Sequence, residues 1–131
     1  MKLYLLDAGG AGLIFVAIGV ALIFMIIAIL VEAFVMMGFK YHAFKKSLVD
    51  STIVNVASLV AGLLLVSSSE DVFNISTTGG FLLLFGITVV IEFIGLYLLN
   101  KHQSLGKTAL VCVTMNMITY FILYLFIRSD F

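Results

Sequence analysis

The chain has 131 residues, of which 63% are hydrophobic and 11% are charged, and its formal net charge is zero. This balance lies far outside that of soluble domains and predicts an integral membrane protein. The sparse basic residues exclude a nucleic-acid-binding surface, and the one cysteine excludes an intrachain disulfide. At about 20 apolar residues per bilayer crossing, residues 1–131 form one transmembrane domain of four helices.

The apolar runs are interrupted by charges and turn residues, which place the helices in chain order. Residues 3–6 predict a short interfacial stretch, and Ala8-Gly9-Gly10 predicts a flexible break before the first span. The runs are apolar at both odd and even positions and are too long for the strands of a barrel, so the predicted fold class is all-α. The four predicted spans cover approximately residues 12–37, 48–66, 79–99 and 107–127.

The basic residues predict the orientation of the spans. Loops 38–47 and 100–107 hold or border five of the seven basic residues, whereas the middle connection carries two acids and no base. The positive-inside rule then places these two loops in the cytoplasm and both termini outside, and we expect a bacterial inner membrane. The five residues are Lys40, Lys45, Lys46, Lys101 and Lys107.

A polar pattern occurs twice in these apolar runs. Glu92 follows Glu32 by sixty positions, and the Asn residues of the next helices, Asn55 and Asn116, lie sixty-one positions apart. A hydroxyl residue follows each Asn by three positions, on the same helical face. Because an even number of crossings separates the halves, the pattern predicts two tandem parallel-repeat hairpins, about 12–66 and 79–127.

This duplicated pattern is the candidate site, since polar side chains within a bilayer are costly and require partners. Within each hairpin the Glu can reach the Asn of the following helix. One interpretation is that the polar side chains hold helices in register without a ligand. The other is a proton or cation site lined by carboxylates and carboxamides. The predicted intramembrane polar network is Glu32, Asn55, Ser58, Glu92, Asn116 and Thr119.

No further chemistry is predicted from the remaining residues. His42 and His102 each follow the Glu of their half by ten positions, but neither has a cysteine or carboxylate cluster at metal-ligand spacing. We therefore predict no metal and no cofactor. The chain also lacks a phosphate-binding glycine loop and the known hydrolase and zinc motifs, so we do not expect an enzyme.

The sequence favours a non-catalytic accessory or assembly subunit of a larger membrane complex, because so small a bundle leaves much apolar surface for partners. The expected partners are the lipid bilayer and other membrane-protein subunits, and the pattern is compatible with a homo-oligomer. The alternative is an oligomeric proton- or cation-coupled transporter or channel that uses Glu32 and Glu92.

Overall fold

The computed structural model describes residues 2–68 and 78–128, with side-chain surroundings for residues 18–65, 67 and 78–126. The regular structure of these residues is helical, as predicted. Each of the four helices contains a segment of 21 or 22 residues that is long and apolar enough to cross a membrane. This suggests an integral membrane protein. The helices are α1 (Lys2–Gly38), α2 (Phe44–Ser68), α3 (Thr78–Leu99) and α4 (Leu105–Arg128).

The four helices pack in a ring, in which α1 and α3 each lie against both α2 and α4. The backbones of the two diagonal pairs, α1 with α3 and α2 with α4, stay further apart. The turns at 39–43 and 100–104 lie at the same end of the bundle, which we call the loop end. The predicted acidic connection between α2 and α3 falls largely within 69–77, outside the described residues.

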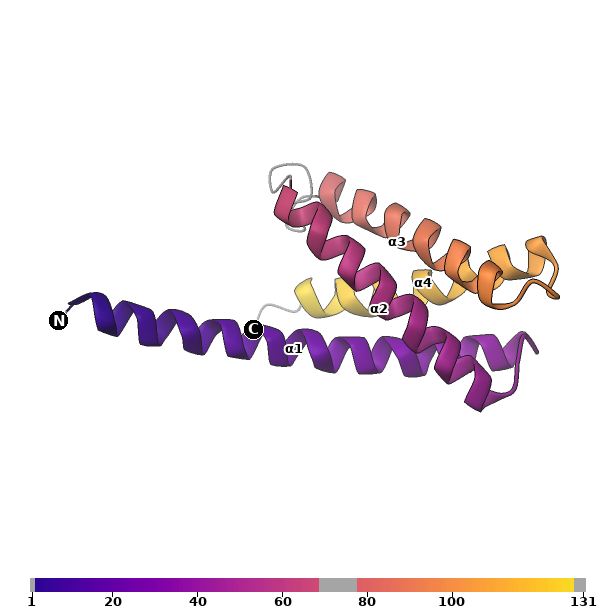
Figure 1. Ribbon diagram of the computed structural model, residues 1–131, viewed down its shortest axis with the longest axis horizontal. Helices are drawn as coiled ribbons and strands as arrows, with labels where there is room; N and C mark the ends of the chain where they lie inside the picture. Colours follow the sequence, from indigo (N-terminus) through magenta and orange to yellow (C-terminus); the bar gives the residue numbers. More distant parts are fainter. Residues whose placement is uncertain (1, 69–77, 129–131) are drawn as a thin grey trace.

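The start of α1 differs from the sequence-based expectation. We predicted a break at Ala8-Gly9-Gly10, whereas α1 is continuous from Lys2 and extends past the other helices (Figure 1). Two glycines cost a helix only about 1 kcal/mol each, and the chain has no proline to interrupt it. At about 1.5 Å per residue, the 37 residues of α1 measure roughly 55 Å, well beyond a hydrocarbon core of about 30 Å.

Local hydrogen bonds fix the helix ends that form the loop end. Lys40, two residues beyond the end of α1, has a φ of 51°, and the Tyr41 N–H donates to the Met36 carbonyl at 2.8 Å. The Lys40 N–H donates to the Met37 carbonyl, so α1 ends in a Schellman motif that turns Tyr41 back toward the bundle. Ser104 Oγ accepts from the Lys107 N–H at 3.3 Å and caps α4, which therefore begins before the predicted position.

Candidate functional site

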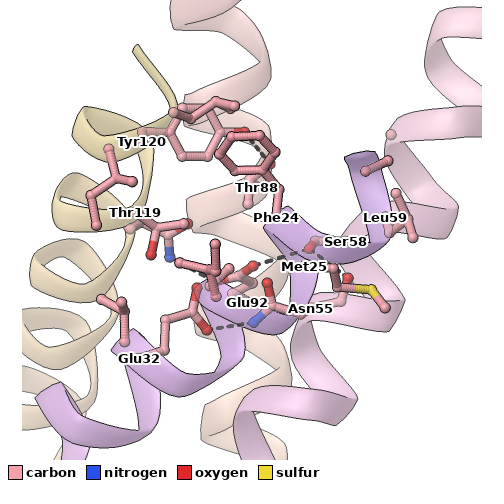
Figure 2. Close-up of a pocket in the computed structure, with 18 of the residues that line it drawn as sticks. Phe24, Met25, Glu32, Asn55, Ser58, Leu59, Thr88, Glu92, Thr119 and Tyr120 are labelled. Carbon is pink, nitrogen blue, oxygen red and sulfur yellow. Dashed lines mark hydrogen bonds between the residues drawn. The ribbon is translucent and has the colours of Figure 1, made fainter. Parts of the chain in front are cut away.

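Two acidic side chains lie together inside the bundle. Glu32 comes from α1 and Glu92 from α3, and each is only 1% exposed. Their carboxyl groups are close enough to interact electrostatically, and Figure 2 shows both of them among the polar side chains of neighbouring helices. Helices on opposite sides of the ring thus bring their acids together.

Glu32 accepts hydrogen bonds from α2. Ser51 Oγ donates to Glu32 Oε2 at 2.8 Å, and Asn55 Nδ2 donates to the same oxygen. Both bonds use Oε2, so neither occupies Oε1. The Asn55 amide also donates to the Ser51 carbonyl at 3.0 Å, which fixes the direction of its side chain.

Glu92 accepts hydrogen bonds from two different helices. Asn116 Nδ2 on α4 donates to Glu92 Oε2 at 2.6 Å, and Ser58 Oγ on α2 donates to Oε1 at 3.0 Å. The Ser58 bond joins the first hairpin to the second, although the sequence pattern was interpreted as contacts within each hairpin. Thr119 interacts with Glu32, again between hairpins, but its buried Oγ1 makes no direct hydrogen bond within the described part of the chain.

The two hairpins repeat the same smaller contacts. A side chain early in the second helix donates to a carbonyl three residues before the Glu, and the Asn amide then donates to the backbone carbonyl of that same residue. The matching pairs are Ser51 to the Ile29 carbonyl and Cys112 to the Val89 carbonyl, both 3.3 Å, and Asn55 to Ser51 and Asn116 to Cys112, both 3.0 Å. We call Glu32, Ser51, Asn55, Ser58, Glu92, Asn116 and Thr119 the carboxyl layer.

A cavity of about 350 Å³ lies next to the carboxyl layer. Every helix contributes one face to its lining, and on α3 the lining residues Leu84, Thr88 and Glu92 are spaced four apart. The cavity extends from the carboxyl layer away from the loop end, between apolar walls. Tyr120 lies on this side, where its hydroxyl shares a 2.9 Å hydrogen bond with Thr88 (Figure 2).

Apolar side chains close the other side of the carboxyl layer. Met36, Val54, Leu96, Val111 and Met115 are at most 1% exposed and form one packed cluster, which we call the plug. Met36 follows Glu32 by four residues and Leu96 follows Glu92 by four, so these two plug residues lie about 6 Å toward the loop end. The acids of the carboxyl layer therefore face a cavity on one side and packed apolar side chains on the other.

The plug includes a close approach of two helices. A Cβ atom on Gly95 of α3 would lie only 2.8 Å from Val54 Cγ1 of α2. Real side chains essentially never lie at that separation, so a larger residue at this position would force Val54 or the two helices to shift.

A second polar cluster lies beyond the plug, at the loop end. Asp50 of α2 is fully buried, forms an ion pair with Lys46, and accepts from Asn100 Nδ2 at 2.9 Å. Asn100 Oδ1 in turn bonds His42 Nε2 at 2.7 Å, and the His42 ring lies 5.4 Å from that of His102. These residues connect the two turns, and we call Asp50, Lys46, Asn100, His42, Tyr41 and Thr108 the loop-end layer.

Tyr41 joins the loop-end layer from inside the bundle. Its hydroxyl shares a 2.9 Å hydrogen bond with Thr108 Oγ1, and its backbone carbonyl accepts from Gln103 Nε2 at 2.8 Å. Burial raises the pKa of the Tyr41 hydroxyl, and the bond to Thr108 offsets part of that rise. Tyr41 therefore stays neutral and holds the first turn against α4.

The sequence reasoning missed the loop-end layer. Asp50 lies four residues after Lys46, a spacing that pairs them on a helix surface, but it also lies near the start of the predicted span, beside a basic loop, where solvent exposure is the simpler expectation. His42 and His102 do approach each other, yet the described residues contain no group of three or more His, Cys, Asp or Glu side chains that could hold a metal ion.

No family of known proteins, no curated protein and no solved structure matches this chain. The two polar layers, the plug and the cavity are therefore the features that bear on its function.

Proposed function

We propose that the protein is an integral membrane protein that binds protons or cations at Glu32 and Glu92 and moves them across the bilayer. The observation that carries this proposal is the meeting of two buried carboxyl groups beside a cavity. Among the described residues that line the cavity there is no Lys, Arg or His. Two acids without a cationic partner repel each other, and a proton or cation between them removes that repulsion.

The plug favours a transporter over an open channel. A channel requires a continuous polar path, whereas the side chains that follow Glu32 and Glu92 by one turn toward the loop end, Met36 and Leu96, are apolar and fully buried in the plug. An ion at Glu32 and Glu92 has access from the cavity side alone. Release toward the loop end requires the helices around the plug to separate, as in alternating access.

The transport proposal is tested by flux into liposomes. Purified protein should dissipate an imposed proton or cation gradient, and the Glu32→Gln/Glu92→Gln variant should abolish that flux while keeping its thermal stability. The matched control is Thr52→Val/Thr114→Val, which removes two polar groups that bond only to their own helices. Equal flux through wild type, the Gln variant and empty liposomes would refute the proposal.

We also propose that the bundle consists of two tandem hairpin repeats. The matching hydrogen bonds of Ser51 and Cys112 to carbonyls of the preceding helix support this, as does the spacing of sixty residues on the odd helices and sixty-one on the even ones. Two hairpins that share one central site can rock against each other around it, which suits alternating access.

For orientation, we propose that the loop end faces the cytoplasm of a bacterial inner membrane and that both termini lie outside. The support is the five lysines in or beside the two turns, set against the acidic connection between α2 and α3. Cysteines introduced at His102 and Ser67 should react with a membrane-impermeant maleimide from opposite sides of sealed vesicles. Labelling of both positions from the same side would contradict this topology.

A second candidate function is an accessory or assembly subunit of a larger membrane complex. The specific observation in its favour is α1, whose N-terminal part continues past the other helices (Figure 1). Gentle detergent extraction should then recover the protein with other membrane polypeptides or with further copies of itself, and deletion of residues 2–11 should release them. An isolated monomer in native mass measurements would count against this role.

A further inference from the structure

We propose that the cavity binds a lipophilic amine in its ammonium form, with the cationic head at Glu32 and Glu92 and the apolar body between the helices. The inference names the substrate class of the site proposed above and rests on that function. It follows from three features of the cavity. Its walls are apolar, its floor is the carboxyl layer, which offers hydrogen-bond acceptors, and its described lining residues include no basic side chain.

The walls require an apolar ligand body. Beyond the carboxyl layer, the lining is made mainly of hydrocarbon and aromatic side chains, and the volume of about 350 Å³ lies within the usual range for small-molecule sites. A bare inorganic cation needs oxygen ligands on every side, which these walls do not offer. The apolar lining includes Phe24, Met25, Leu59, Leu63, Leu84 and Leu123.

The floor requires a ligand that donates hydrogen bonds. The Asn55 and Asn116 amides and the Ser58 hydroxyl already donate to the two carboxyl groups, so the atoms left for a ligand are acceptors. Both donors to Glu32 from α2 bond to the same oxygen, Oε2. The buried Thr119 hydroxyl lies beside the same carboxyl, and its oxygen can accept a further hydrogen bond from a ligand.

An ammonium group matches this floor better than a neutral or anionic group. It carries three donors and a positive charge, and charge-assisted hydrogen bonds to a carboxylate are about twice as strong as neutral ones. An anion would meet two acids with no basic residue among the described lining. A hydroxyl could bond to the same oxygens but would leave the repulsion between the carboxylates in place.

The decisive experiment compares three probes of nearly equal shape: 4-phenylbutylamine, 4-phenylbutanol and 4-phenylbutyrate. Their binding to the full chain in nanodiscs is measured by calorimetry, with empty nanodiscs subtracted. We expect the amine to bind at least about tenfold more tightly than the alcohol, and the acid not to bind. The Glu32→Gln/Glu92→Gln variant should reduce amine affinity to that of the alcohol.

A variant that leaves the carboxyl layer intact tests the walls. A Cβ on Gly62 meets no atom within 4 Å, and Gly62 lines the cavity, so Gly62→Leu should fill it and weaken amine binding at least about tenfold. Gly86 has equal space but does not line this cavity, so Gly86→Leu is the matched control and should bind as wild type does.

The outcomes separate the substrate class from the transport function. Amine and alcohol affinities within about twofold of each other on wild type, or amine binding that survives both variants, would overturn the inference. If either outcome occurs while the protein still moves protons or inorganic cations into liposomes in a way that requires Glu32 and Glu92, the transport proposal stands without the amine. Glu-dependent amine binding without any flux supports the site and refutes transport.

Discussion

The bundle buries acidic side chains in two layers, and their partners differ. In the loop-end layer, Asp50 has a lysine as ion-pair partner, an amide donor from Asn100, and a histidine nitrogen 4.0 Å away. In the carboxyl layer, Glu32 and Glu92 have only neutral hydroxyl and amide partners among the described residues, and each other. One layer contains its own cation, and the other does not.

The difference indicates different roles for the two layers. A buried acid with a cation and a full set of hydrogen bonds fixes the packing of the elements that supply them. A pair of acids beside a cavity, with acceptors unused, leaves room for a proton or cation from outside the chain. Asp50 and Ser51 are adjacent on α2, but on α1 and α3 the plug residues Met36 and Leu96 lie between the two layers, so substitutions in each layer can be compared.

Removal of the lysine from the loop-end layer should have the largest effect on stability. Lys46→Met leaves Asp50 buried without its ion-pair partner, and we expect the free energy of unfolding to fall by about 2 to 3 kcal/mol. The partial exposure of Lys46 keeps the expected loss below that of a fully buried pair. Thermal unfolding in detergent measures the change.

Lys45 provides the control for this substitution. It is adjacent in sequence, carries the same charge and is exposed, so Lys45→Met should change the stability by less than about 0.5 kcal/mol. Equal losses for Lys45→Met and Lys46→Met would show that net charge matters and that the Asp50 pair does not.

A larger residue at Gly95, within the plug, should have the next largest effect on stability. Gly95→Ala places a methyl group against Val54 Cγ1, and overpacking of this kind should cost about 1 to 2 kcal/mol. Val54→Ala in the same chain should restore much of the loss, because it removes the clashing atom. Gly86→Ala meets no such atom and should be neutral or stabilising.

Gly95→Ala also tests whether the plug is the barrier to ion movement. If the plug is the barrier between the carboxyl layer and the loop end, Gly95→Ala should raise proton leak in liposomes relative to Gly86→Ala. Unchanged leak together with the predicted loss of stability would place the barrier to ion movement elsewhere in the bundle.

Much of the fold could be predicted because its signals are local. The lengths of the apolar runs predicted the number of helices, and the lysines marked the turns. The predicted spans therefore differ from the observed helices by only a few residues at most ends. The start of α1 was the exception, since the effect of two glycines depends on the helix around them. The pairing of Glu32 with Asn55 followed from equal depth on adjacent helices.

What could not be predicted depends on the order of helices around the ring. Ser58 and Asn55 lie three residues apart on the same helix, yet they bond to different acids because α2 stands between α1 and α3. The spacing of polar residues along one helix does not specify which further helix packs against it. The burial of Asp50 depends likewise on Asn100, fifty residues away.

A smaller effect is expected within the loop-end layer from Tyr41. Tyr41→Phe removes the hydrogen bond to Thr108 and should cost about 1 kcal/mol at neutral pH. Since burial raises the pKa of Tyr41, its stabilising contribution is complete below the unfolded pKa of about 10 and is lost as pH rises through the folded value. Stability should therefore fall less steeply above pH 10 in the variant than in wild type.

The carboxyl layer should show the smallest change in stability. Glu32→Gln and Glu92→Gln keep the shape of each side chain and an oxygen that accepts from the same amide and hydroxyl donors. No cation among the described residues loses its partner, so each variant should remain within about 1 kcal/mol of wild type. A loss as large as that of Lys46→Met would make Glu32 and Glu92 structural and remove the contrast between the layers. Wild-type stability combined with lost flux would assign the carboxyl layer to ion binding.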